Sequence, residues 1–357
     1  MVSAEAAAWA LRLFVGREPH DQAEVEFHRG HPDIGSLRRS FAGTVEFQDF
    51  LASSVQASSG ADQPAAAMSE MARLLRAMEA RLAAMEEASH GARSTYMGDG
   101  LVLTKAVVHG AQIAFLVEAG DRLLSPWFIV SGRYETELTD FFVNILRPDD
   151  RCLDVGANFG YFTCLFARFA PSGQVIGVEP DPRVFAIARD NVHINGFGAI
   201  AGMRNAAACE SERELTLHRR VGRSGNTSIA QVPRSFTELL GEPPTESFRV
   251  AGITIDRLAE EMGGRVDVMK VDVEGAEPLV FAGAARTIAA NPAIQIAMEW
   301  SPGQISAAGF DVGKFVDDLS GLGLGLHGLE PGRPRFSREA LLNLPYATGI
   351  LLTQRPR

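Results

Sequence analysis

The segment CLDVGANFG, residues 152–160, has residue types and spacing suited to binding a cofactor where a strand ends. Asp154 closes an apolar run, and Gly156, Asn158 and Gly160 precede a second apolar run. In an open α/β sheet, ligands bind at the carboxyl ends of strands, where a helix begins. A dinucleotide site needs a glycine where Asn158 stands, because its backbone must lie against a pyrophosphate. A carboxylate at Asp154 would repel that pyrophosphate and attract a cation.

A second carboxylate, Glu179, ends the next apolar run, VIGVEP, at the separation expected for one β-α-β step. A carboxylate in this position can accept hydrogen bonds from both hydroxyls of a ribose in either cofactor class. S-adenosylmethionine carries an ammonium, a sulfonium and no phosphate. Asp154 and Glu179 together therefore favour S-adenosylmethionine over NAD, although a glycine turn that only packs a helix is the simpler alternative.

The segment KVDVEGAE, residues 270–277, places three charged residues close together. Lys270, Asp272 and Glu274 alternate with valines, and a period of two predicts that they share one side of a strand. Charges on a buried strand are costly unless they are paired or functional. We expect these three side chains to face the cofactor cleft as catalytic candidates; a purely structural lysine–carboxylate pair is the alternative.

Residues 95–357 alternate strand-like and helix-like runs. Such β-α-β alternation predicts an α/β fold, a mainly parallel sheet with helices on both faces. A hairpin, LVLTKAVVH and AQIAFLVE, is expected to lead into this domain. The expected strands are RCLDVG, QVIGVEP, VDVMKVDVEG and IQIAMEW, and the expected helices are YETELTDFFVNIL, YFTCLFARFA, DPRVFAIARDNVHING, ITIDRLAEEM and EPLVFAGAARTIAAN.

The chain before this domain divides into three parts. Residues 1–52 predict a small α-helical module, and residues 53–67 are a Ser-, Ala- and Gly-rich linker. Residues 68–90 predict an amphipathic, coiled-coil-like helix. Its apolar seam repeats at steps of three and four residues, at Met68, Met71, Leu75, Met78, Leu82 and Met85. This helix either forms a homodimer through residues 68–85 or lies on its own chain.

Composition limits the partners and the compartment. The formal net charge of −10 over 357 residues disfavours nonspecific binding to nucleic acid phosphates and anionic lipids. Cys152, Cys164 and Cys209 show no disulfide spacing, which favours reduced thiols. No segment is typical of a signal peptide or a transmembrane span. We therefore expect a cytoplasmic protein without a nucleic acid partner.

The motifs LDVGANFGYFT, VIGVEPDP, NVHINGF and MKVDVEGAEPLVFAGA together resemble those of the FkbM family of S-adenosylmethionine-dependent O-methyltransferases. The resemblance covers residues from about 133 to 300. It implies a Rossmann-like methyltransferase fold with a seven-stranded sheet, and methyl transfer to a hydroxyl, often on a sugar of a glycan or natural product. The stretch LFVGREPHDQAEVEFHRGHPDIGSLRRSFAGTVEF, residues 13–47, also resembles short helical domains that accompany bacterial glycan-modifying enzymes.

The resemblance also implies which residues bind the cofactor. The segment SGNTSI, residues 224–229, corresponds to a Ser-rich family segment near the cleft. The cofactor residues carried over by position are Glu135, Asp154, Gly156, Ala157, Asn158, Gly160, Phe162, Thr163, Glu179, Pro180, Asn205 and Ala206.

Methyl transfer needs the acceptor oxygen aligned with the methyl–sulfur bond and a base for the hydroxyl proton. Asp272 or Glu274 could be that base. Alternatively, both could join Glu299 in holding a divalent cation such as Mg²⁺, since hard cations prefer carboxylate oxygens. Lys270 could orient a carboxylate or bind an anionic group of the substrate. His193 belongs to the helix expected after the second strand, away from the cleft, and no motif surrounds His109 or His218. None of the three is expected to be the base.

The leading hypothesis is an O-methyltransferase that acts on a sugar or glycan. The alternatives are a methyltransferase for a polyketide or other small secondary metabolite, and a catalytically inactive scaffold with the same fold. An NAD-dependent oxidoreductase is disfavoured by Asn158. We expect residues 218–250 and 301–345 to shape the acceptor pocket.

Overall fold

The computed structural model describes residues 20–31, 93–330 and 332–355, together with Leu11, Leu37, Ser40, Val45 and Arg73. The chain divides into two compact units, Met1–Gly91 and Ala92–Arg357. In the first unit, helix α2 (Gln22–Arg29) begins at Asp21, whose side chain accepts a hydrogen bond from the Glu24 amide. The predicted linker and the coiled-coil-like helix lie almost wholly outside the described residues, so the dimer stays a prediction.

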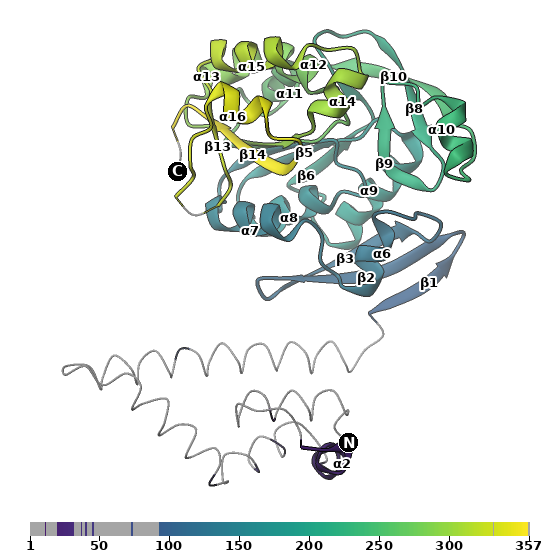
Figure 1. Ribbon diagram of the computed structural model, residues 1–357. Coiled ribbons are helices and arrows are strands. Elements are labelled where there is room, and N and C mark those ends of the chain that lie inside the picture. The colour runs from purple at the N-terminus through teal and green to yellow at the C-terminus, as the bar shows by residue number, and fades with distance from the viewer. Residues whose placement is uncertain are drawn as a thin grey trace, which may run out of the picture. The chain divides into compact units, whose positions relative to one another are not determined.

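The second unit is built on a seven-stranded sheet in the order β13-β14-β12-β11-β4-β5-β6 (Figure 1). The five strands from β12 to β6 are parallel, and β14 runs antiparallel to both of its neighbours. This arrangement confirms the predicted Rossmann-like methyltransferase fold. The strands are β4 (Arg151–Val155), β5 (Gln174–Val178), β6 (Ala201–Arg204), β11 (Val268–Val271), β12 (Gln295–Trp300), β13 (Gly325–His327) and β14 (Ala347–Thr353).

Helices cover both faces of this sheet because its strands are apolar on both sides. In β4, Cys152 belongs to one buried apolar cluster, and Leu153 and Val155 belong to another. The first cluster contains α7 (Thr136–Ile145), α8 (Tyr161–Phe169) and α9 (Pro182–Ile194). The second contains α11 (Ile255–Glu261), α12 (Glu277–Ala282), α13 (Ala285–Ala290), α14 (Pro302–Ala307), α15 (Val312–Gly321) and α16 (Arg338–Leu342). The two groups lie on opposite sides of the sheet in Figure 1.

A three-stranded antiparallel sheet precedes this core: β1 (Ser94–Gly98), β2 (Leu101–Val108) and β3 (Ala111–Glu118). It contains the predicted hairpin, which is confirmed. Asn191 of α9 and Asn195, which follows the last residue of α9, hold β3 against the core with hydrogen bonds like those of a neighbouring strand. The Asn191 side chain accepts from the Leu116 amide at 2.6 Å and donates to its carbonyl at 2.9 Å, and Asn195 makes the same pair of bonds with Ala114. Helix α6 (Ser125–Val130) follows β3.

The sequence analysis did not foresee a four-stranded sheet, which has the order β7-β10-β8-β9. Its strands are β7 (Ala207–Ala208), β8 (Glu214–Arg220), β9 (Arg223–Ser228) and β10 (Glu246–Ile253), with helix α10 (Arg234–Leu239) between β9 and β10. Because β8 and β9 contain many polar residues, their apolar alternation was weak. In the described residues, no helix is long and apolar enough to cross a membrane.

Two predicted elements differ from the structure. Strand β11 ends at Val271, so Asp272 and Glu274 lie in the turn after it, and only Lys270 is placed by the strand period. The predicted helix EPLVFAGAARTIAAN is two helices, α12 and α13. The chain turns at Gly283, where a Cβ atom would lie 2.2 Å from the Cys209 carbonyl oxygen. This close backbone approach, which only glycine permits, interrupts the helix.

Candidate active site

A cavity of about 730 Å³ lies beyond the carboxyl ends of β4, β5 and β11. It is the position at which an open parallel sheet binds its ligands. Among the predicted site residues, those lining the cavity are Glu135, Gly156, Ala157, Asn158, Phe162, Glu179, Pro180, Ala206, Lys270, Asp272, Glu274 and Glu299. Asp154, Gly160, Thr163 and Asn205 do not line it.

The turn after β4 lies directly against the turn after β11. Gly156 has φ +79°, and a Cβ atom on it would stand 1.7 Å from the Asp272 carbonyl oxygen. The Gly156 and Ala157 amides both donate to the Val178 carbonyl, at 3.0 and 2.9 Å. Gly156 therefore allows the strand ends that carry Glu179 and Asp272 to meet at one cavity.

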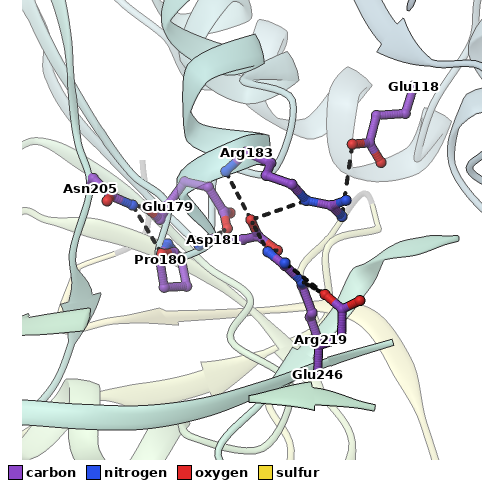
Figure 2. A network of polar contacts seen from close by, with 8 residues as sticks. All are labelled: Glu118, Glu179, Pro180, Asp181, Arg183, Asn205, Arg219 and Glu246. Atoms are coloured by element: carbon purple, nitrogen blue, oxygen red, sulfur yellow. Dashed lines mark hydrogen bonds and ion pairs between the residues drawn. The ribbon is translucent and has the colours of Figure 1, made fainter. Parts of the chain in front are cut away.

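Glu179 is buried at the end of β5, and backbone amides fix its carboxylate. Oε2 accepts from the Asn158 amide and Oε1 from the Asp181 amide, each at 2.9 Å. Each oxygen keeps a second lone pair for a ligand hydroxyl. Burial raises the pKa of Glu179 to about 8. Asn205 donates from its side-chain amide to the Glu179 and Pro180 carbonyls, both at 2.9 Å, and so holds this loop from outside the cavity (Figure 2).

Asp154 lies behind the cavity wall. It is fully buried, and its Oδ2 accepts a 2.6 Å hydrogen bond from the Thr163 hydroxyl of α8. Burial raises its pKa, whereas Lys270, its register partner on β11, opposes that rise. The carboxylate therefore orders the turn through Thr163 rather than facing the cavity, contrary to the expectation that it attracts a ligand cation directly.

Lys270 is a counter-ion within the wall. Its ammonium donates to the Gly156 carbonyl at 3.1 Å and to Asp272 Oδ2 at 3.0 Å, and lies 5.4 Å from the centre of the Phe162 ring. Burial lowers the pKa of Lys270, but the carboxylates of Asp272, Asp154 and Glu135 outweigh burial and raise the pKa above its ordinary value. Of its two predicted roles, orienting a carboxylate fits this environment better than binding an anionic substrate group.

Glu274 is held from three sides in the turn after β11. Its Oε2 accepts from the Gln304 side-chain amide of α14, and Asn226 Nδ2 of β9 lies 3.4 and 3.5 Å from its two oxygens. The Ser228 hydroxyl donates to its backbone carbonyl at 2.8 Å. Burial, and then repulsion from Asp272, raise the pKa of Glu274 to about 8. The carboxyl group is therefore a stronger base than an exposed glutamate.

Two further glutamates complete the acidic lining. Glu299, at the end of β12, accepts a 3.0 Å hydrogen bond from the Tyr346 hydroxyl, and its Oε2 has no hydrogen-bond partner. Burial, then the charge of Asp272, raise its pKa to about 9. Burial also raises the pKa of Glu135 to about 7.

Three cavity residues other than glycine adopt left-handed backbone conformations: Glu135 at φ +40°, Asn158 at +48° and Glu274 at +55°. Side chains rarely tolerate this region, and such strain gathers at functional sites.

Asp272, Glu274 and Glu299 do not form a metal site. Within the part of the chain that the structure describes, no three His, Cys, Asp or Glu side chains come together in a way that could hold a metal ion. The alternative in which these carboxylates bind a divalent cation is therefore not supported.

The order of the strands in the sheet, with β4 between β5 and β11, divides the cavity into two halves. The turns after β4 and β5 and the segment after β6 supply Gly156–Phe159, Glu179 and Ala206. On the other side of β4, the ends of β11 and β12 and the start of β14 supply Asp272, Glu274, Glu299 and Tyr346. We call these the β4–β5 half and the β11–β12 half.

Residues 154–320 match the family model described as the methyltransferase FkbM domain. These residues form an FkbM methyltransferase domain. The matched residues include the lining of both halves from Gly156 to Glu299, but not Tyr346.

Curated relatives of the chain include other methyltransferases. The 2-O-methyltransferase NoeI of Sinorhizobium fredii is 28% identical over 151 residues, which are 40% of this chain and 60% of NoeI. Methyltransferase 1 of Beauveria bassiana is 27% identical over 154 residues, 38% of this chain and 59% of that protein. The AMB antimetabolite synthetase AmbE of Pseudomonas aeruginosa is 26% identical over 39% of this chain and 8% of its own length. The chain thus spans less than two thirds of each relative.

Among solved structures, the 16S rRNA N2 G1207 methyltransferase of T. thermophilus, in complex with AdoMet and guanosine, aligns with 73% of this chain and 52% of its own. The identity is 13% and the TM-score 0.39.

Parts of the cavity wall come from outside the FkbM domain. Leu123, Leu124, Trp127 and Tyr134 precede it, and Tyr346 follows it. Sequence reasoning missed these residues because they belong to no motif. Two segments, 218–250 and 301–345, were expected to shape the acceptor pocket. In the first, residues 224–229 line the cavity; in the second, no described residue does.

Asp121 ties this outer wall to the FkbM domain. Its Oδ1 accepts from the amides of Leu123 and Leu124 at 2.9 and 2.6 Å, and its Oδ2 accepts from the Ser224 amide at 2.6 Å. Pro126, at the start of α6, is a helix-start signal that could have located this wall.

Proposed function

We propose that this chain is an S-adenosylmethionine-dependent O-methyltransferase whose acceptor is a hydroxyl of a sugar or glycan. The FkbM domain supports methyl transfer, since this is the reaction of its family. The observation that carries the choice of oxygen is Glu274. A half-buried carboxyl with a pKa raised to about 8 lines the half of the cavity next to the β4–β5 half, and a hydroxyl needs such a base.

The β4–β5 half suits S-adenosylmethionine. The free lone pairs of Glu179 can accept from ribose hydroxyls, and Ala206, Ala207 and Leu215 offer apolar surface for an adenine ring. The carboxylates of Glu135 and Asp272 suit the positive charges of the methionine part. A dinucleotide would bring its pyrophosphate against this acidic wall, which disfavours it.

Bound S-adenosylmethionine supplies a methyl group on a positively charged sulfur, already a good leaving group. In the proposed reaction, an acceptor hydroxyl oxygen in the β11–β12 half bonds to the methyl carbon while the carbon–sulfur bond breaks. The electron pair of that bond stays on sulfur, giving S-adenosylhomocysteine, and the hydroxyl proton passes to Glu274. Gln304 and Asn226 hold the Glu274 carboxyl in place for this transfer. Alignment of the acceptor contributes on the order of 7–11 kcal/mol at best.

The polar lining of the β11–β12 half supports a sugar acceptor. Glu299, Asn226 and Thr227 offer several hydrogen-bonding groups to a polyhydroxylated ring. The similarity to NoeI, named a 2-O-methyltransferase, agrees with this choice, as does the resemblance of residues 13–47 to glycan-associated domains. The apolar side chains of Leu123 and Leu124 favour the alternative, a polyketide or other small secondary metabolite.

The test is formation of S-adenosylhomocysteine from S-adenosylmethionine with two acceptor panels, methyl glycosides with oligosaccharides, and apolar hydroxylated compounds. Turnover confined to saccharides supports the proposal, and turnover confined to the apolar panel supports the alternative. Cofactor binding without turnover on either panel would favour an inactive scaffold. Glu274→Gln serves as the negative control, since it removes the proposed base.

A further inference from the structure

A polar network joins the four-stranded sheet to the loop that carries Glu179 (Figure 2). Arg219, near the end of β8, places its Nη1 at 3.2 Å from both carboxylate oxygens of Asp181. Its Nε and Nη2 donate to Glu246 of β10 at 2.9 and 2.7 Å. The guanidinium also lies over the Phe248 ring. Arg219 is thus fixed in its own sheet while it reaches across to the FkbM core.

Asp181 connects this arginine to the cavity. It is 1% exposed, and its Oδ1 accepts from the Arg183 amide at 2.9 Å, which caps the start of α9. Its own backbone amide donates to Glu179 Oε1 at 2.9 Å. The side chain of Asp181 therefore faces Arg219, and its main chain orients the carboxylate proposed to bind ribose.

Arg219 is the stronger of two cations beside Asp181. The Arg183 guanidinium lies 3.9 Å from Asp181 Oδ1 and 3.9 Å from Glu118 of β3, and its side chain is 48% exposed. These distances are too long for hydrogen bonds, and solvent weakens such exposed pairs. Without Arg219, the buried Asp181 carboxylate would keep the Arg183 amide but only this weak cation, and a buried charge that loses its main counter-ion forces a rearrangement.

We propose that Arg219 is a positioning residue for the cofactor, acting through Asp181 to hold Glu179 in the orientation that accepts the ribose hydroxyls. The inference rests on the S-adenosylmethionine site proposed above. The β8–β9 hairpin that carries Arg219 also carries Asn226 and Ser228, which contact Glu274. One hairpin therefore supports both halves of the cavity.

Titration calorimetry of the full chain with S-adenosylhomocysteine tests the proposal. Arg219→Gln is expected to weaken binding about tenfold, because Glu179 loses its fixed orientation. Arg219→Lys should recover part of the loss, since an ammonium can still pair with Asp181 but not in the forked geometry. The matched control is Arg249→Gln. Arg249 lies in β10 and pairs with Glu214 at 3.2 Å, but its side chain is 75% exposed and takes no part in the hydrogen bonds and ion pairs of Asp181. Arg249→Gln should bind S-adenosylhomocysteine as tightly as the wild type does.

A second ligand separates positioning from general loss of structure. In the wild type, the 2′-deoxy analogue of S-adenosylhomocysteine should bind more weakly than the parent, because it lacks a hydroxyl for Glu179. In Arg219→Gln, the ratio of the dissociation constants of the 2′-deoxy analogue and the parent should fall toward one. Unchanged binding in Arg219→Gln, or an equal loss for both ligands, would overturn the inference. A wild type that binds neither ligand would overturn the proposed function, and the inference with it.

Discussion

Glu274 is the residue on which the proposed chemistry most directly depends. Its left-handed backbone at φ +55° and its contacts with Gln304 and Asn226 bring a half-buried carboxyl to the cavity. Asp272, the other candidate base, is already engaged by Lys270 at 3.0 Å. The two carboxylates thus differ in what surrounds them, which favours Glu274 as the proton acceptor.

Glu274→Gln should lower kcat about 10²- to 10⁴-fold, the usual contribution of a positioned base. Its affinity for S-adenosylhomocysteine should stay within about twofold of the wild type, because Glu274 lies in the β11–β12 half. Steady-state kinetics and calorimetry measure the two effects. Glu339→Gln, on the exposed first turn of α16, is the control. A variant that keeps wild-type kcat would remove Glu274 from the mechanism.

The raised pKa of Glu274, about 8, predicts how activity depends on pH. The base must be deprotonated to accept a proton, so kcat/KM for the acceptor should rise with pH and level off above about 8. Rates at saturating S-adenosylmethionine between pH 6 and 10 would show this limb. A profile that is flat over this interval would contradict Glu274 as the base.

At the scale of elements, the turns after β4 and β11 form the site by touching each other. Gly156 permits the contact because a Cβ atom there would lie 1.7 Å from the Asp272 carbonyl oxygen. A methyl group added at Gly156 should therefore disturb the contact between the two turns, even if it does not touch a ligand.

Gly156→Ala should destabilise the fold by more than about 3 kcal/mol, combining backbone strain with the clash. Gly196→Ala is the matched control. Gly196 has a similar φ of +73°, but nothing lies within 4 Å of its Cβ position, so only strain of about 1–2 kcal/mol is expected. Chemical denaturation measures both. Equal losses in the two variants would mean that the turns do not press on each other.

The elements that carry strong apolar periods were predictable from the sequence, and those that depend on distant contacts were not. Strands β4 and β5 and helices α8 and α9 follow directly from their patterns. Lys270, Asp272 and Glu274 were correctly grouped, but a strand period does not explain Glu274. Its place comes from a turn packed on Gln304, some 30 residues later. Trp127 and Arg219 were missed because neither belongs to a motif. The place of Trp127 in the cavity wall and the contact of Arg219 with Asp181 depend on segments far apart in the sequence.

At the scale of the whole molecule, three buried or half-buried carboxyl groups affect stability together. Burial raises the pKa values of Glu179, Glu274 and Glu299 to about 8, 8 and 9, from an ordinary value of 4.5. The folded protein binds these protons more tightly than the unfolded chain, so the stabilisation is complete below about pH 4.5 and is lost as pH rises toward 9.

The melting temperature of the ligand-free protein should therefore fall between pH 5 and pH 9. S-adenosylmethionine should raise it more at pH 9 than at pH 6, because its positive charge compensates the ionised carboxylates. Thermal unfolding with and without the cofactor across this range is the measurement. A melting temperature that rises steadily toward pH 9 would show that these groups are not buried as described.

The unit Ala92–Arg357 contains the whole cavity. A chain lacking residues 1–90 should therefore bind S-adenosylhomocysteine with wild-type affinity. Light scattering on the full and shortened chains tests the predicted homodimer through residues 68–85: a dimer that becomes a monomer on truncation supports it, and monomers in both cases contradict it.

The most direct test of the account is calorimetric titration of the wild type and of Glu179→Gln with S-adenosylhomocysteine, with NADH as a second ligand. The account predicts one site with a dissociation constant on the order of 10 µM for the wild type, at least about tenfold weaker binding for Glu179→Gln, and no binding of NADH. Wild-type protein that binds NADH but not S-adenosylhomocysteine would contradict the assignment of the cavity, and the roles proposed for its residues would have to be abandoned.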